Sequence, residues 1–222
     1  MHTHLQELTA RFKAHANPAH AEPMAAYMKG HFHYLGIKSP LRRELQKDFL
    51  KQVPNPDRSV DNGIVEALWA LDAREYQYVA IDLLIKCAKY GPEDAIDVYE
   101  KLVLDRSWWD SVDMLAKVIG IHFSKYPHLI HPRVNAYLDS EEMWLQRIAL
   151  LFQLHYKQQT NWELLEHCIL YCIGSKEFFI QKAIGWALRQ YSRVNPDQVE
   201  AFIASHPLAP LSKREGLKYI NR

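Results

Sequence analysis

Glu177-Phe-Phe-Ile-Gln-Lys-Ala183 is one of three similar stretches that decide the predicted fold. The other two are Glu142-Met-Trp-Leu-Gln-Arg-Ile148 and Glu75-Tyr-Gln-Tyr-Val-Ala-Ile81. Each begins with an acid, which suits the positive end of a helix dipole, and continues with aromatic or large apolar residues. A related aromatic opening, Ser107-Trp-Trp109, follows Arg106, so that the copies begin at residues 75, 106, 142 and 177. Their steps of 31, 36 and 35 residues predict a two-helix repeat of the HEAT type.

Helix signals are dense along the rest of the chain, whereas signals for strands are nearly absent. A capping residue precedes a proline, as at many helix N-termini, in Asn17-Pro18, Ser39-Pro40 and Asn195-Pro196. Two capping boxes are predicted, Asp139 with Glu142 and Ser212 with Glu215. Stacked helix pairs form a curved solenoid whose concave face is lined by equivalent helices. We therefore expect an all-α, C-shaped solenoid of HEAT-like repeats with a concave groove, as a single domain over residues 1–222.

Composition excludes several classes of protein. Of the 222 residues, 48% are hydrophobic and 24% are charged, which is typical of a soluble globular protein. No apolar run approaches the roughly 20 residues that cross a bilayer, and the N-terminus lacks the layout of a secretory signal. We therefore expect a cytoplasmic protein without a membrane segment. The chain has no Gly-rich phosphate or dinucleotide motif and no nucleophile elbow, so we expect no cofactor.

The three cysteines, Cys87, Cys168 and Cys172, do not form a disulfide framework. Cys168 and Cys172, with His167 beside them, could contribute to a metal site. However, no second ligand pair has zinc-like spacing. Two small core residues on one helix face are the simpler interpretation, and we expect no metal.

Aromatic and charged residues share helix faces in three of the repeats. Trp109 and Asp113 are four residues apart, and Trp144 and Arg147 are three apart, so each pair lies on one face. A longer stripe of the same kind consists of Phe178, Lys182, Trp186 and Arg189. The competing interpretation places the tryptophans in the core and the charges on its rim. Asp113 argues against that interpretation for its own helix, because a buried carboxylate is costly unless it is paired.

Asp113 on an aromatic-lined face, with Arg147 on a neighbouring repeat, is a candidate reaction centre that stabilises a cation. Lys213-Arg214, after Ser212, could bind a phosphate at a helix N-terminus, although basic pairs on helices are more often only solvated. The formal net charge of +1 does not by itself indicate a nucleic-acid partner.

Several motifs, taken together, are familiar. They span nearly the whole chain in order: Tyr27-Met-Lys, Leu35-Gly-Ile, Pro40-Leu-Arg-Arg, Ser107-Trp-Trp-Asp-Ser-Val-Asp, Trp144-Leu-Gln-Arg, Ser175-Lys-Glu-Phe-Phe-Ile-Gln-Lys-Ala-Ile-Gly-Trp and Leu208-Ala-Pro-Leu-Ser-Lys-Arg-Glu. With these motifs the chain resembles the AlkD-like DNA alkylation repair enzymes, a family of DNA glycosylases with HEAT-like repeats. One departure is His155, which stands where a lysine is expected in relatives.

The resemblance implies a monofunctional glycosylase of base excision repair, which hydrolyses the N-glycosidic bond of cationic N3- or N7-alkylated purines. Asp113 is then the catalytic carboxylate, with Trp109 and Trp186 beside it, and the lesion is engaged through its sugar and phosphate. The DNA contacts that we expect are Arg147, Tyr27, Phe178, Phe179, Lys182, Arg189, Arg43, Lys213 and Arg214. The implied partner is double-stranded DNA that contains alkylated purines, and we expect a monomer that is associated with the nucleoid through DNA.

Two other functions fit the sequence. A relative could bind a DNA structure without catalysis, because a solenoid groove can hold a duplex with or without chemistry. A solenoid could also bind proteins, which is the commonest use of such repeats and which fold alone does not exclude. The intact Asp113, Trp109 and Trp186 favour the enzyme.

Overall fold

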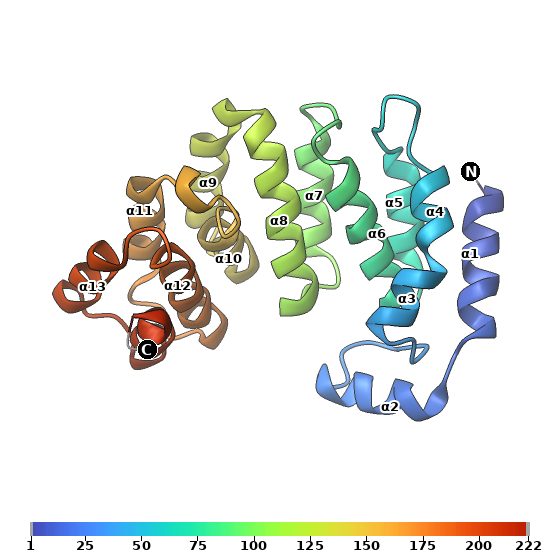
Figure 1. Cartoon of the computed structure of the whole chain (residues 1–222), viewed down its shortest axis with the longest axis horizontal. Helices are drawn as coiled ribbons and strands as arrows, with labels where there is room; N and C mark the ends of the chain where they lie inside the picture. Colours follow the sequence, from blue (N-terminus) through green and yellow to red (C-terminus); the bar gives the residue numbers. More distant parts are fainter. Residues whose placement is uncertain (1, 221–222) are drawn as a thin grey trace. The chain divides into compact units, whose positions relative to one another are not determined.

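The protein is built from helices. A computed structural model describes residues 2–220, and this part of the chain contains fourteen α-helices, three 3-10 helices and no strand (Figure 1). The prediction of an all-α helical-repeat fold is confirmed, and the C-shaped curvature stays a prediction. None of the helices in the described part of the chain combines the length and the apolar character needed to cross a membrane.

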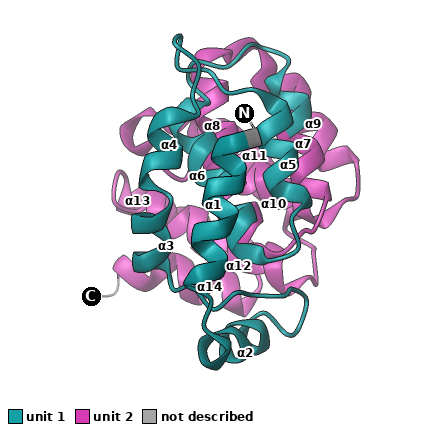
Figure 2. Ribbon diagram, turned by 90° about the vertical axis from the view of Figure 1, so that its right-hand side faces the viewer, with its two compact units in different colours: residues 1–98 teal, residues 99–222 magenta. Residues whose placement is uncertain are grey.

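The chain divides into two compact units, residues 1–98 and residues 99–222 (Figure 2). The helices of unit 1 are α1 (His2–Ala14), α2 (Pro18–Tyr27), α3 (Ser39–Leu45), α4 (Lys47–Gln52), α5 (Asn62–Ala70) and α6 (Arg74–Cys87). Helix α7 (Ala95–Leu104) contains the boundary between the units. The expectation of a single domain stays a prediction.

Unit 2 holds the candidate active site. Its α-helices are α8 (Trp109–Lys125), α9 (Ile130–Asp139), α10 (Met143–Leu151), α11 (Trp162–Cys172), α12 (Phe178–Tyr191), α13 (Pro196–Ser205) and α14 (Pro210–Gly216). Three short 3-10 helices cover Pro127–Leu129, Lys157–Gln159 and Leu217–Tyr219. Helix α10 packs against α8 on one side and α12 on the other, and α12 packs against α14. These four helices therefore follow one another in space as they do in the sequence.

The repeat is more regular than the sequence comparison indicates. Four equivalent helices follow the N-caps Ala73 (α6), Trp108 (α8), Glu142 (α10) and Glu177 (α12), which are 35, 34 and 35 residues apart. The predicted register is wrong at two copies, because Glu75 lies two residues after its N-cap and Arg106 two residues before. The corrected register places five of the twelve predicted site residues, Arg43, Asp113, Arg147, Lys182 and Arg214, at one position of the repeat. The fifth residue after the N-cap is Arg43 in α3, Tyr78 in α6, Asp113 in α8, Arg147 in α10, Lys182 in α12 and Arg214 in α14.

Glu75 fits the acid pattern by sequence but has a different structural role. Its carboxylate is fully buried and accepts hydrogen bonds from the backbone N–H groups of Leu35, Gly36 and Ile37, at 3.0, 2.9 and 3.0 Å. Gly36 has a φ of +84°, and a Cβ there would lie only 2.1 Å from the carbonyl oxygen of Asn17. Glu75 therefore fixes the loop before α3 and satisfies buried amide groups that otherwise lack partners.

The predicted helix starts are only partly right. Asn17 and Asn195 are N-caps, as predicted, whereas Ser39 is the first residue of α3 and Lys38 is its cap. Both predicted capping boxes are wrong. Asp139 ends α9, and Glu142 itself caps α10. Ser212 lies inside α14, where its hydroxyl donates to the carbonyl oxygen of Gln181 at 2.8 Å. A contact with another helix replaces the local cap in this case.

Most of the large apolar side chains are buried between the helices. Trp144 belongs to this core, so the interpretation that places the tryptophans in the core holds for that residue.

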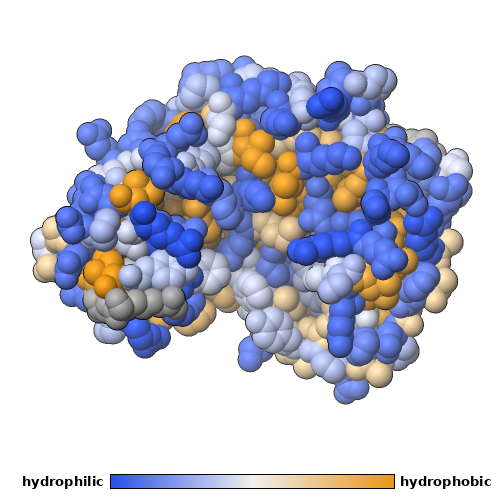
Figure 3. Space-filling model, in the orientation of Figure 1, coloured by the Kyte–Doolittle hydropathy of each residue, from blue (hydrophilic) through white to orange (hydrophobic). Residues whose placement is uncertain are grey.

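Cys168 and Cys172 are buried and free, and burial raises the pKa of the Cys168 thiol to about 12 and that of the Cys172 thiol to about 11. On the face shown in Figure 3, hydrophilic residues predominate and hydrophobic residues are exposed in separate patches.

Gly185 allows α14 to lie unusually close to α12. A Cβ at Gly185 would be 2.6 Å from the Cβ of Glu215 and 3.1 Å from the carbonyl oxygen of Ser212. Neither distance is compatible with an ordinary van der Waals contact. The absence of a side chain at residue 185 therefore brings Glu215 against α12, where it forms part of the candidate site.

We expect Gly185→Ala to lower the free energy of unfolding by roughly 1 kcal/mol or more. Overpacking costs about 1–3 kcal/mol, and the better helix propensity of alanine offsets up to about 1 kcal/mol of it. Gly174→Ala is the control, because a Cβ there meets nothing within 4 Å. Urea unfolding of both variants measures the difference. Equal stability of the two variants would contradict the close packing of α12 and α14.

Candidate active site

A buried ion pair joins α8 to α10. Arg147 Nε donates to Asp113 Oδ1 at 2.7 Å, and a terminal nitrogen of the same guanidinium donates to Oδ2 at 2.9 Å. The Arg147 residue is 1% exposed, whereas the Asp113 side chain keeps 19% of its surface in solvent. Such a two-fold contact fixes the orientation of the carboxylate as well as its charge. The Asp113 carboxylate is therefore held rigidly and still faces an accessible space.

The environment of Asp113 raises the pKa of its carboxyl group. Burial raises the pKa of the Asp113 carboxyl above its ordinary value of 3.8, the hydrogen bonds and charge of Arg147 oppose this shift, and the nearby Asp110 adds to it. The carboxylate is thus less stabilised than one in water, despite its partner. A cation that approached Asp113 would find an anion that has lost much of its hydration.

Arg147 also connects this pair to α12. Its guanidinium donates to the backbone carbonyl oxygen of Phe179, and its central carbon lies 5.5 Å from the ring centroid of Trp186. One side chain therefore links α8, α10 and α12. The structure brings together Asp113, Arg147 and Trp186, which the sequence placed in three different repeats.

Three cations surround the ring of Trp186. Besides Arg147, the Lys182 ammonium is 6.0 Å and the Arg189 guanidinium 5.8 Å from its centroid. Both cations also bind Glu215 of α14, at 2.8 and 2.9 Å. The hydrogen bond from Lys182 holds the pKa of the Glu215 carboxyl below its ordinary value. We call Arg147, Lys182 and Arg189 the cation cluster.

The cation cluster keeps a net positive charge. It contains three cations, and the two carboxylates that bind it, Asp113 and Glu215, compensate for two of them. One positive charge therefore remains beside the ring of Trp186, which matches the single negative charge of a phosphodiester group.

Aromatic rings form a wall beside Arg147. The ring of Phe179 lies 5.2 Å from that of Trp108, 5.1 Å from that of Trp144 and 5.4 Å from that of Phe178. Phe178 is 58% exposed, so the outer end of this wall faces solvent. An exposed aromatic ring beside a positive cluster is a suitable surface for a sugar or a base.

The other predicted residues lie at more varied places. Trp109 is half-buried and begins α8. On α14, Lys213 is half-buried and Arg214 is exposed. Tyr27, which is 70% exposed at the end of α2, and Arg43, which is exposed on α3, belong to unit 1. Their expected contacts with the same DNA stay predictions.

Two residues of the site escaped the sequence interpretation. Glu215 was assigned to a local cap, although its partners Lys182 and Arg189 precede it by 33 and 26 residues. Trp108, the neighbour of Trp109, contributes its ring to the aromatic wall. The repeat spacing could have indicated Trp108, because this residue is the N-cap of α8 and is equivalent to the N-caps Glu142 and Glu177.

The fold and the site together define a helical-repeat protein with a held carboxylate and a positive, aromatic surface next to it. The model of the DNA alkylation repair enzyme family matches residues 8–220 of the chain. The chain belongs to the DNA alkylation repair enzyme family. This family acts in the repair of alkylated DNA, so DNA is the substrate of the chain.

A solved structure supports the same assignment. The chain is similar to a predicted DNA alkylation repair enzyme from Enterococcus faecalis, with 38% sequence identity and a TM-score of 0.86. The similarity covers 93% of this chain and 97% of the other. A comparison with curated proteins gives no match.

Proposed function

We propose that the protein is a monofunctional DNA glycosylase that excises cationic N3- or N7-alkylated purines by hydrolysis of the N-glycosidic bond. The observation that carries this proposal is the Asp113 carboxylate, which Arg147 holds by both oxygens while 19% of the side chain stays exposed. Membership of the DNA alkylation repair enzyme family supports alkylated DNA as the substrate.

The charge of the lesion determines which groups the reaction needs. Alkylation at N7 or N3 makes the purine cationic, so it leaves as a neutral base without a general acid. The positive charge then moves to the deoxyribose as an oxocarbenium ion. A carboxylate has about four lone-pair sites, and Arg147 occupies two. Asp113 keeps the others to stabilise the sugar cation and to orient the attacking water.

The cation cluster has a different role from Asp113. Its remaining positive charge binds a phosphate next to the lesion and holds the sugar near the carboxylate. Trp186 already faces three cations, so its ring separates and positions them. The exposed ring of Phe178 offers an apolar contact at the edge of the site. The lesion is thereby engaged through sugar and phosphate.

The reaction ends with base release and leaves the DNA strand intact. A lyase step needs a free amine that attacks the sugar and forms a Schiff base. Lys182 is the lysine in contact with the Trp186 ring, and Glu215 holds its ammonium at 2.8 Å. That amine is engaged as a structural cation, and we infer a hydrolytic mechanism without strand cleavage.

The charge requirement tests the proposal directly. A duplex with one N7-methylguanine is compared with a duplex that carries 7-deaza-7-methylguanine, which has the same shape but no charge. We expect release of the base from the first duplex, no release from the second, and equal binding of both. Binding without release would favour a DNA-structure-binding protein, and the absence of any DNA binding would favour a protein-binding solenoid.

The rate of excision should fall on the acid side of its pH profile. The carboxylate is the active form, and the raised pKa of Asp113 means that protonation begins at a higher pH than for an ordinary aspartate. The rate is therefore constant at high pH and decreases as the pH falls, with a midpoint above 3.8. Single-turnover rates with N7-methylguanine measure this profile. A midpoint at or below 3.8 would contradict the environment described for Asp113.

A further inference from the structure

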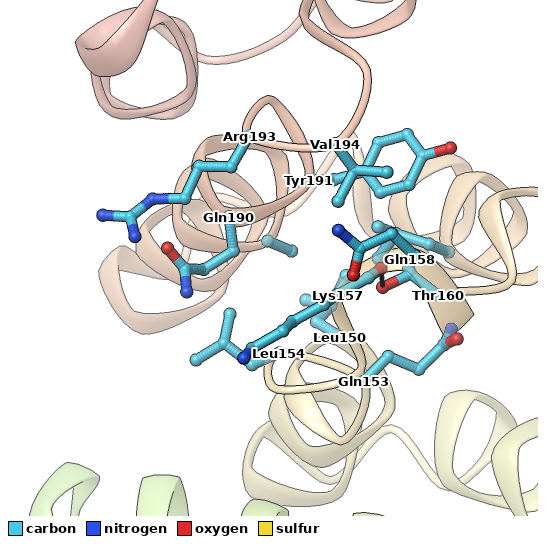
Figure 4. Close-up of a pocket in the computed structure, with 12 residues that line it drawn as sticks. Leu150, Gln153, Leu154, Lys157, Gln158, Thr160, Gln190, Tyr191, Arg193 and Val194 are labelled. Atoms are coloured by element: carbon cyan, nitrogen blue, oxygen red, sulfur yellow. Dashed lines mark hydrogen bonds between the residues drawn. The ribbon is translucent and has the colours of Figure 1, made fainter.

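Unit 2 also contains a cavity whose lining does not include Asp113. A cavity of about 230 Å³ opens where α10 and α12 end (Figure 4). Leu150, Leu154 and Leu165 contribute apolar surface, and Lys157, Gln190 and Arg193 contribute polar groups. We call it the terminal cavity. An apolar pocket with a few polar groups that converge on it is the usual form of a small-ligand site.

Several polar side chains line the terminal cavity and lack a hydrogen-bond partner in the part of the protein that the structure describes. In Figure 4 the ends of Lys157, Gln190 and Arg193 lie on the same side of the cavity. Within residues 2–220, the Lys157 ammonium and the amide groups of Gln158 and Gln190 have no hydrogen-bond partner in the protein. By contrast, the Gln153 amide is satisfied by the backbone of Asn161. Lys157 and Gln158 are exposed and Gln190 is half-buried, so these groups are solvated in the free protein and accessible to a ligand.

Lys157 is held in an unusual backbone conformation. Its φ is +55°, a left-handed value that side chains other than glycine and asparagine rarely adopt. This conformation begins the short 3-10 helix Lys157–Gln159, and the side chain extends across the terminal cavity in Figure 4. Strained residues that the surrounding structure maintains tend to lie at functional sites. Lys29, Arg58, Arg106 and Glu141 share this conformation, so what distinguishes Lys157 is that its side chain extends across the terminal cavity.

The chemistry of the terminal cavity fits a nucleotide. The leucine side chains suit the face of a flat base, and the amides of Gln158 and Gln190 can both donate to and accept from the edge of a base. The Lys157 ammonium suits a phosphate, and so does the Arg193 guanidinium, whose central carbon lies 4.3 Å from the ring centroid of Tyr219. A released purine base has no phosphate, so these two cations favour a nucleotide over the free product base.

The position of the terminal cavity relates it to the candidate active site. Arg147 lies inside α10 and Trp186 inside α12, whereas Leu154 and Arg193 lie just beyond the ends of these helices. The terminal cavity is therefore at the C-terminal ends of the two helices that carry Arg147 and Trp186.

We propose that the terminal cavity is a nucleotide-binding subsite, in which a base lies against the leucines and its phosphate is bound by Lys157 and Arg193. The nucleotide comes either from the DNA, as a neighbour of the lesion that is displaced from the duplex, or from solution. The DNA source rests on the proposed function, whereas the subsite itself does not. A nucleotide from either source has the same base and phosphate groups, and the experiment below distinguishes the two sources.

The test uses two lysines with the same backbone conformation. Lys157→Gly removes the ammonium and relieves the left-handed strain, so the fold is retained. Lys29→Gly is the matched control, because Lys29 has a φ of +58° and lies in unit 1. The probe is deoxyguanosine monophosphate, with deoxyguanosine and inorganic phosphate alone for comparison. The readout is the NMR shift of backbone amides in residues 153–160 and 187–194.

We expect the nucleotide to bind more tightly than either of its parts, and to shift these amides in the parent protein and in Lys29→Gly. Lys157→Gly should weaken this binding at least tenfold. A second arm uses duplexes with 2-aminopurine at each of the three positions on either side of an uncleavable lesion analogue. A fluorescence change that depends on Lys157 assigns the displaced nucleotide as the ligand. Nucleotide binding without that change assigns the free nucleotide.

The subsite is overturned if neither arm gives a response that depends on Lys157. Excision of N7-methylguanine is measured separately on the same proteins. A parent protein that binds the nucleotide but releases no base refutes the proposed function and keeps the subsite. A parent that excises the base without any response at Lys157 keeps the function and overturns the subsite.

Discussion

Asp113→Asn should slow the excision of N7-methylguanine by about 10²–10³-fold, the scale for the loss of one preorganised electrostatic group. Asparagine keeps the shape of the side chain and can still accept a hydrogen bond from Arg147. It removes the negative charge that stabilises the sugar cation as the bond breaks. The ground-state duplex carries no such cation, so its affinity should stay the same or rise slightly, since a carboxylate repels phosphates.

Single-turnover excision and equilibrium duplex binding separate these two effects. Glu163→Gln is the charge-matched control, because Glu163 is an exposed acid in the first turn of α11 in the same unit. It should excise at the parent rate. Excision by Asp113→Asn at the parent rate would show that the carboxylate is not the catalytic group.

Arg147→Ala should lower both stability and activity. Removal of one partner from a buried ion pair costs about 3–5 kcal/mol, because the other charge stays buried without compensation. We expect the lower end of this range, since the Asp113 side chain is 19% exposed. The variant also loses the contact with the Phe179 carbonyl and one member of the cation cluster. Duplex binding and excision should therefore both weaken, unlike in Asp113→Asn.

A double variant separates the structural role of Arg147 from its functional role. In Arg147→Met with Asp113→Leu the two charges are replaced by apolar side chains of similar volume, which is often neutral for stability. Urea unfolding should show that most of the lost stability returns, whereas excision stays absent. Failure to recover stability relative to Arg147→Ala would mean that the unpaired Asp113 charge is not the cause of the loss.

The sequence predicts the proximity of Asp113 and Arg147 better than it predicts the repeat register. Asp113 and Arg147 were found because a carboxylate on an aromatic face needs a partner, and because equivalent helices start about 35 residues apart. The register was off by two residues at Glu75, because this acid binds the loop at residues 35–37 and not its own helix terminus. Sequence similarity cannot distinguish these two uses of an acid.

The partners of the basic residues could not be derived from local spacing. Ser212 and Glu215 have the spacing of a capping box, yet both side chains contact α12 because Gly185 admits α14 at short range. Glu215 is one of the two carboxylates that bind the cation cluster. Its position therefore depends on Gly185, which lies in α12. The terminal cavity was also not predictable, since residues far apart in the sequence, from Leu150 to Val194, line it together.

The most direct test of the proposed function is the product analysis of one reaction. A duplex with a single N7-methylguanine is incubated with the parent protein, and the released material and the strand are identified by mass. We predict free N7-methylguanine and an uncut strand with one abasic site. An intact N7-methylguanine strand after complete binding, or a strand cleaved at the lesion, would contradict a hydrolytic glycosylase built on Asp113.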